Sequence, residues 1–109
     1  MICEECDVVV VPFPFVDRAE AKRRPALVLS KKNFNRNGHT VLAMMTTSAH
    51  HPWPGDLGIK QRESTGLTTP CMVRLKLFTL DNRLIVKRIG HLADADRDKV
   101  TKSIRANLI

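Results

Sequence analysis

The chain has 109 residues, of which 43% are hydrophobic and 27% are charged. This length and composition predict one globular domain over residues 1–109 and exclude a disordered chain. A total of 18 lysines and arginines against 11 aspartates and glutamates gives a net charge of +7. Such a surplus suits RNA, DNA or an acidic protein as a partner, although a merely basic, soluble surface is the plainer alternative.

The first six residues lack the basic start of a secretory signal, and the longest apolar run, residues 8–16, is too short to cross a membrane. We therefore expect a cytoplasmic protein with no membrane partner. Cys3, Cys6 and Cys71 are an odd number of thiols, and their single CxxC pair lacks the second pair that a structural zinc site needs. We expect incidental thiols, no metal and no other cofactor.

Four valines near the start of residues 7–15 predict a buried strand. Pro12 and Pro14 remove backbone donors, so this strand ends there or lies at an edge of the sheet. Residues 16–24 are polar and charged, and we expect them to connect this strand to a second strand at residues 26–30.

The middle of the chain alternates loops with apolar runs. Residues 31–39 contain an Asn-Gly turn signal, and the apolar residues 40–46 predict a third strand that is central in the sheet. The sequence then predicts a loop at 47–55, a short strand at 56–60, a loop at 61–66, and strands at 71–80 and 83–92 around a tight turn at Asp81 and Asn82.

The period of the apolar residues changes at the end of the chain. Val100, Ile104 and Leu108 are spaced four apart, which predicts an amphipathic helix over residues 94–108 that packs on the sheet. Asp94 or Asp96 is suited to cap its start. Strands followed by one helix predict a small, strongly curved antiparallel sheet or barrel, mainly β or α+β in class.

The densest positive charge of the chain, Lys22-Arg23-Arg24, stands directly before Pro25 and the second strand. Pro25 biases Arg24 toward an extended conformation, so its guanidinium should be held at the entry to the strand. A guanidinium can grip a phosphate with two parallel hydrogen bonds. The alternative is an edge arginine whose stem covers apolar surface.

Three hydroxyls, on Thr46, Thr47 and Ser48, follow the third predicted strand and could donate to phosphate oxygens. If the second and third strands are neighbours, Arg24 and Thr46 face one cleft; otherwise the hydroxyls mark an ordinary loop start.

The loop that follows carries His50, His51 and Trp53. These side chains could stack on a nucleobase or act as acid and base, or the tryptophan could simply anchor a surface loop. Further on, Arg74 and Lys76 are two residues apart, so they share one face of their strand and could extend a track of phosphate contacts.

The stretch DVVVVPFPFVDRAEAKRRPALVLS resembles the opening of the MazF/PemK family of toxins from toxin–antitoxin pairs. The resemblance continues through TVLAMMTTS, WPGDLGI and TGLTTPCMVRLKLFTLDNRLIVKRIGHL, and so covers nearly the whole chain. It implies a small SH3-like barrel of the CcdB/PemK type with a C-terminal helix, which forms a homodimer and is inhibited by a cognate antitoxin protein.

The resemblance also implies the activity of an mRNA interferase, a metal-independent and sequence-specific endoribonuclease acting on single-stranded RNA. The substrate's own 2′-hydroxyl attacks the adjacent phosphate and leaves 2′,3′-cyclic phosphate and 5′-hydroxyl ends. Carried onto this chain, the family's catalytic arginine and threonine fall on Arg24 and Thr46, and Glu20 is a candidate general base. The residues expected to bind RNA are Arg18, Lys22, Arg23, Thr47, Ser48, Trp53, Arg74 and Lys76.

The chain departs from the family pattern in places. Cys6 stands where a glycine is usual, and Lys76 stands where some members have an acidic residue. Two other functions remain open on the same fold: a gyrase poison of the CcdB type that cuts nothing, and a basic nucleic-acid-binding module. The pairing of Arg24 with Thr46 favours the ribonuclease, because a gyrase poison would not need it.

Overall fold

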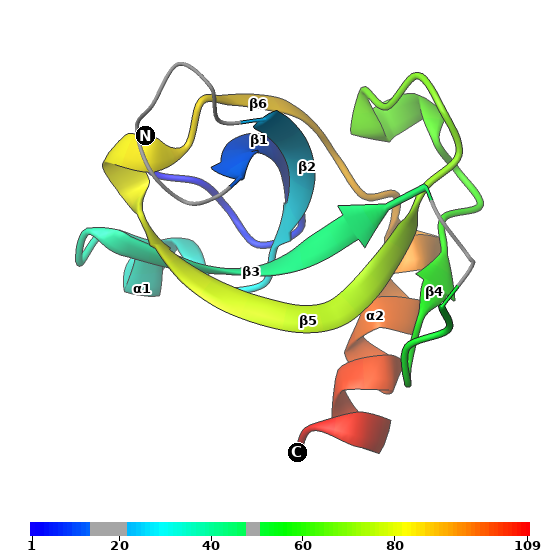
Figure 1. The fold of residues 1–109 in the computed structure, drawn as a ribbon. Helices are drawn as coiled ribbons and strands as arrows, with labels where there is room; N and C mark the ends of the chain where they lie inside the picture. Colours follow the sequence, from blue (N-terminus) through cyan, green and yellow to red (C-terminus); the bar gives the residue numbers. More distant parts are fainter. Residues whose placement is uncertain (14–21, 48–50) are drawn as a thin grey trace.

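The computed structural model describes residues 1–13, 22–47 and 51–109. Their strands form one antiparallel sheet in the order β4-β5-β3-β2-β1-β6, which curls on itself with α2 packed near β4 (Figure 1). The strands are β1 (Asp7–Phe13), β2 (Lys22–Val28), β3 (His39–Thr46), β4 (Leu57–Gly58), β5 (Met72–Asp81) and β6 (Lys87–His91). The helices are α1 (Lys32–Asn35) and α2 (Asp94–Asn107), with 3-10 turns η1 (Glu63–Thr65) and η2 (Asn82–Leu84). The expected curved antiparallel sheet with a C-terminal helix is confirmed.

The sheet is packed on both faces, because successive side chains of each strand point to opposite sides. One side, which we call the Leu42 face, lines the inside of the curl; the other, the Leu27 face, is covered by α2 through Val100. The core of the Leu42 face comprises Cys3, Val9, Val11, Ala26, Val28, Leu42, Leu80 and Ile85. The core of the Leu27 face comprises Cys6, Val8, Leu27, Ala43, Met45, Val73, Leu92 and Val100. Each fully buried Val or Leu stabilises the fold by about 1.5–3 kcal/mol.

The second strand begins at Lys22 and not at Ala26 as the sequence predicted. Its charged first residues pair in register with the end of β1, with Arg24 opposite Val11 and Lys22 opposite Phe13. These three cations are exposed, so their backbone completes the ladder without burying charge. Local composition indicated a connecting loop here, and pairing with β1 overrode it.

The described part of the first strand runs to Phe13. β1 lies between β2 and β6, but its pairing with β6 stops at Val10. Pro12 therefore stands where β1 has β2 as its one partner in the described sheet, opposite Arg23. A missing N–H is tolerated at such a local edge. Pro14 lies outside the described residues.

A buried network of amides joins the N-terminus, α1, β3 and η2. The sequence did not predict α1, whose last residue Asn35 is fully buried and donates from Nδ2 to the Cys3 carbonyl at 2.9 Å. Asn82 donates from Nδ2 to the Asn35 carbonyl at 2.6 Å and accepts from the Thr40 hydroxyl at 2.6 Å. Loss of one member would leave buried polar partners unpaired.

The C-terminal helix starts at Asp94, as predicted, but neither aspartate of its first turn caps it. Ala93 is the N-cap and makes no side-chain capping bond. The buried carboxylate of Asp96 instead accepts from the backbone N–H groups of Lys60 at 3.1 Å and Gln61 at 3.0 Å. Asp96 therefore ties the segment after β4 to the helix. Among the described residues, no helix is long and apolar enough to span a membrane.

Cys6 has a left-handed backbone, with φ of +68°, at the turn that leads into β1. Its N–H donates to the Val28 carbonyl at 2.8 Å, and its carbonyl accepts from the Leu92 N–H at 3.0 Å, so both adjacent strands fix this conformation. A left-handed backbone costs an ordinary L-residue roughly 1–2 kcal/mol and costs glycine almost nothing. A glycine, which is usual at this position in the family that the sequence resembles, would thus relieve the backbone.

We predict that Cys6→Gly is more stable than Cys6→Ala by about 1 kcal/mol, because alanine keeps the strained backbone and glycine relieves it. The free energies of unfolding are measured with urea under reducing conditions. Cys3 is the matched control, since it is equally a buried thiol but does not have a positive φ. At Cys3 the alanine variant should be more stable than the glycine variant. If the alanine variant were also the more stable one at Cys6, the prediction would be contradicted.

Candidate functional site

Arg24 lies on the exposed half of β2, where the strand leaves the core. Its side chain shares the Leu42 face with Ala26, two residues along, and its guanidinium carbon lies 5.4 Å from the centroid of the Phe13 ring. A contact of this kind orients the planar guanidinium on the aromatic face. Within residues 1–13, 22–47 and 51–109, no carboxylate forms an ion pair with Arg24, whereas four other arginines have one.

The second and third strands are neighbours, which was the condition for Arg24 and Thr46 to face one cleft, because β2 pairs with β3. The register sets Val28 opposite Leu42 and ends with Ala26 opposite Met44. The described pairing stops there, two residues before Arg24 and Thr46, which have the same strand parity as Ala26 and Met44 respectively. Thr46 is half-buried as the last residue of β3.

The remaining cations of the charged segment separate by face. Lys22 has the same strand parity as Arg24 and shares its face, whereas Arg23 points to the opposite side. Thr47 is exposed just after β3. The predicted site residues Arg18, Glu20 and Ser48, together with His50, lie outside the described residues.

A bulge in β5 arranges the second predicted basic pair. Ala43 pairs with Leu77, but the next residue, Met44, pairs with Arg74, so Leu75 and Lys76 have no partner in β3. Bulges of this kind increase twist and redirect side chains beside functional sites. Because the bulge interrupts the alternation between Arg74 and Leu77, parity no longer decides whether Arg74 and Lys76 share a face; Lys76 and the half-buried Phe78 both line the small hollow described below.

Arg74 is held by a carboxylate that the sequence analysis did not assign to it. Its Nε donates to Asp56 Oδ1 at 3.1 Å, and its Nη2 donates to Asp56 Oδ2 at 2.9 Å and to the His51 carbonyl at 3.0 Å. Both side chains are about five-sixths buried, with exposed fractions of 16% and 15%. The hydrogen bonds from Arg74 lower the pKa of the Asp56 carboxyl below its usual value. Arg74 thus fastens the loop before β4 to β5.

Trp53 is anchored by the same arrangement. Its backbone N–H donates to Asp56 Oδ2 at 3.0 Å, and its indole Nε1 donates to the carbonyl of the bulge residue Leu75 at 3.1 Å. The ring keeps 40% of its surface exposed, and the Lys76 ammonium lies 5.8 Å from its centroid. Trp53 therefore anchors its loop, which was one of the two alternatives that the sequence left open. One part of its ring nevertheless stays open to solvent.

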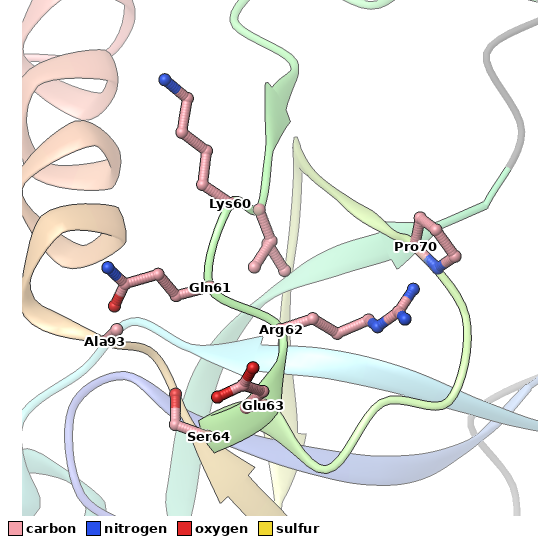
Figure 2. Close-up of a pocket in the computed structure, with 8 residues that line it drawn as sticks. Lys60, Gln61, Arg62, Glu63, Ser64, Pro70 and Ala93 are labelled. Carbon is pink, nitrogen blue, oxygen red and sulfur yellow. The ribbon is translucent and has the colours of Figure 1, made fainter.

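Two hollows differ in position and lining. A small one of about 120 Å³ is lined by Phe13, Met44, Lys76, Leu77 and Phe78, and is connected to Arg24 through the Phe13 ring. A wider one of about 780 Å³ lies between the loops around β4 and the start of α2 (Figure 2). Its lining has both signs of charge, with Lys60 and Arg62 beside Glu63, and does not include Phe13, whose ring contacts Arg24. We therefore locate the candidate site at the smaller hollow despite its size.

The thiols lie apart from this site. Cys3 and Cys6 are buried in the two cores and Cys71 is half-buried, and burial raises the pKa of all three. A raised pKa disfavours the reactive thiolate. Among the described residues, no group of three or more His, Cys, Asp or Glu side chains could hold a metal ion.

A family model described as the PemK-like, MazF-like toxin of type II toxin–antitoxin systems matches residues 4–108. The fold is similar to that of MazF in a MazE–MazF crystal structure from Deinococcus radiodurans, with a TM-score of 0.77 and 21% identity over 99% of this chain and 97% of the other. It is also similar to a mycobacterial endoribonuclease solved in complex with its cognate antitoxin, with a TM-score of 0.76 and 16% identity over 97% and 94% of the two chains. The toxin MazF-mt6 of Mycobacterium tuberculosis follows with a TM-score of 0.73 and 17% identity over 92% and 93%. No curated protein matches the sequence significantly.

We predict that the Asp56–Arg74 pair makes stability fall in acid. The native pKa of Asp56 is lowered, so its contribution is full above the unfolded-state pKa, near 3.9, and is lost as pH falls through the lower native pKa. Asp56→Asn should therefore destabilise the protein at pH 7 but much less at pH 2.5, as measured by urea unfolding. Asp98→Asn, at an exposed position of α2, is the control. An Asp56→Asn deficit of equal size at both pH values would rule the pair out as the cause.

Proposed function

Because the chain belongs to the PemK-like, MazF-like toxins of type II toxin–antitoxin systems, we propose that it is an endoribonuclease that cuts single-stranded RNA, chiefly mRNA. The observation that supports this proposal is the position of Arg24 on β2 and its contact with Phe13. Its guanidinium lies against Phe13 on a strand whose other half is fully buried, and it has no ion-pair partner in the described part of the chain. A guanidinium held against an aromatic ring at the exposed end of a buried strand suits a phosphodiester.

In the proposed reaction, the 2′-hydroxyl oxygen of the substrate attacks the neighbouring phosphorus. The new P–O2′ bond closes a 2′,3′-cyclic phosphate, the P–O5′ bond breaks, and the departing oxygen takes up a proton as a 5′-hydroxyl. Arg24 neutralises the charge that grows on the non-bridging oxygens. The nucleophile belongs to the substrate and the guanidinium supplies the charge, so we propose that cleavage needs no metal.

Thr46 is proposed to donate a hydrogen bond that keeps the phosphate in line with the attacking oxygen. Glu20, in the connection between β1 and β2, is the candidate that takes the proton from the 2′-hydroxyl. Exposed cations at the open end, Lys22 on the face of Arg24 and Arg23 on the other, would draw the RNA backbone by long-range attraction. Within residues 22–24, Arg24 would thus act in catalysis, whereas Lys22 and Arg23 would attract the RNA.

The family also supports a set of proposed partners. The Deinococcus and mycobacterial neighbours were solved with MazE and with a cognate antitoxin, respectively. We propose that an antitoxin covers the same basic open end and keeps this protein inactive. We further propose that it works as a homodimer in the cytoplasm, which sedimentation of the purified protein and cell fractionation would test.

Arg24→Ala should lower kcat/KM for RNA cleavage by about 10²–10³-fold, because it removes a preorganised charge from the transition state. Arg24→Lys should recover little of the loss, since an ammonium cannot replace a planar bidentate donor. Cleavage is measured on a long RNA in EDTA, with mapping of the new ends. Circular dichroism and urea unfolding establish that each variant is folded.

Arg23→Ala is the matched control, because it removes the same charge from the adjacent residue on the opposite face. We expect it to weaken binding modestly and to reduce the salt dependence, with kcat preserved. Equal effects at both positions would mean that Arg24 only adds to the net charge. Inhibition of DNA supercoiling without loss of RNA would point to the gyrase poison, and salt-sensitive binding alone to the nucleic-acid-binding module.

A further inference from the structure

The small hollow beside Arg24 has a chemical character that the phosphate chemistry does not use. Its lining is apolar and aromatic except for one cation, Lys76. Phe13 and Leu77 leave 40% and 41% of their surfaces exposed at its mouth. Phe13 belongs to both features, because it lines the hollow and holds the guanidinium of Arg24 over its ring. A group bound here is therefore directly next to whatever Arg24 holds.

We propose that this hollow binds one nucleobase of the substrate, belonging to a nucleotide joined by the scissile phosphate, and that Lys76 makes it prefer a keto base. This inference rests on the proposed ribonuclease function and concerns its specificity. Stacking of a base on an aromatic side chain contributes about 1–3 kcal/mol and tolerates any base. The aromatic lining accordingly supplies binding, and discrimination comes from the polar group at the rim.

Lys76 can only donate hydrogen bonds, because an ammonium has three donors and no acceptor. Uracil presents the O4 acceptor and guanine the O6 and N7 acceptors, whereas cytosine presents an N4 amino donor and adenine an N6 amino donor beside its N7 acceptor. An ammonium at the rim attracts the first two bases and leaves the amino group of the others facing a cation. The preference therefore follows from the kind of donor and does not need a bidentate contact.

The position of Lys76 is restrained on the side away from the hollow. Its ammonium lies over the Trp53 ring, whose indole N–H is bonded to the Leu75 carbonyl. Trp53 is in turn fixed through Asp56 to Arg74. Lys76 thus lines the hollow and also contacts a fixed aromatic ring, and this contact favours rotamers that keep its ammonium near the hollow rather than in open solvent.

Uridine and cytidine oligonucleotides form the matched ligand pair, since the two bases have the same ring size and differ at position 4. Their 2′-O-methyl forms lack the nucleophile and cannot be cut, so binding is measured apart from catalysis. Trp53, the single tryptophan of the chain, reports binding through its fluorescence. We expect the full-length protein to bind the uridine oligomer about tenfold more tightly than the cytidine oligomer.

Lys76→Met removes the donors and keeps the length of the side chain, so the ratio should fall to near one. Lys76→Glu replaces donors by acceptors and should reverse the preference toward cytidine. Lys102→Met, on an exposed position of α2, is the matched control and should keep the wild-type ratio. The proposal would be overturned if the wild type bound the uridine and cytidine oligomers equally, or if Lys76→Met left the preference unchanged. Either result is expected if a protein segment, and not a base, occupies the hollow.

End mapping of RNA cut by the same variants separates this proposal from the function on which it rests. Wild-type cutting with guanine or uracil at one fixed position beside the cut, lost in Lys76→Met, supports both. Wild-type cutting with the same base distribution in Lys76→Met overturns the base hollow and leaves the ribonuclease intact. Failure of the wild type to cut RNA overturns the ribonuclease, and the oligonucleotide ratio then decides the hollow by itself.

Discussion

The candidate site depends on the two halves of β2 being one continuous strand. Its last three residues are fully buried between two cores, and its first three carry exposed cations. Pairing with β1 runs through both halves, so the rigidity of the buried part extends to the charged part. An arginine on a free loop would lose rotamer and backbone freedom on binding RNA, whereas Arg24 has lost much of it in folding.

The surroundings of Arg24 and Arg74 lead to opposite electrostatic outcomes for the same side-chain type. Arg74 has nearly all its surface covered and a carboxylate in a bidentate contact, so its charge is neutralised within the protein. Arg24 is exposed, lies over an aromatic ring and has no carboxylate partner among the described residues. The first arrangement fixes geometry and the second leaves a positive potential directed at solvent. A count of basic residues cannot separate these roles.

The sequence predicted those features that follow from apolar periodicity. The valines of β1, the apolar run of β3 and the spacing of Val100 and Ile104 located strands and helix, and β2 and β3 proved to be neighbours. The sequence did not predict the features that depend on tertiary contacts. These are the charged start of β2, the buried amides around α1, the bonding of Asp96 to the segment after β4, and the Asp56–Arg74 pair. Polar residues carry little periodic signal, and their partners lie far along the chain, so local patterns do not identify them.

The attachment of the loop before β4 has a consequence for how relatives of this protein can diverge. Asp56 accepts from both Arg74 and the Trp53 backbone, and this junction is separate from the two apolar cores. As long as the acid, the arginine and Gly55 are retained, the residues between β3 and Trp53 can be exchanged without repacking the interior. Gly55 is fixed because its φ is +83° and a Cβ there would lie 2.7 Å from Leu75 Cδ1. The loop then behaves as a replaceable cassette, through which new recognition preferences can evolve at little risk to folding.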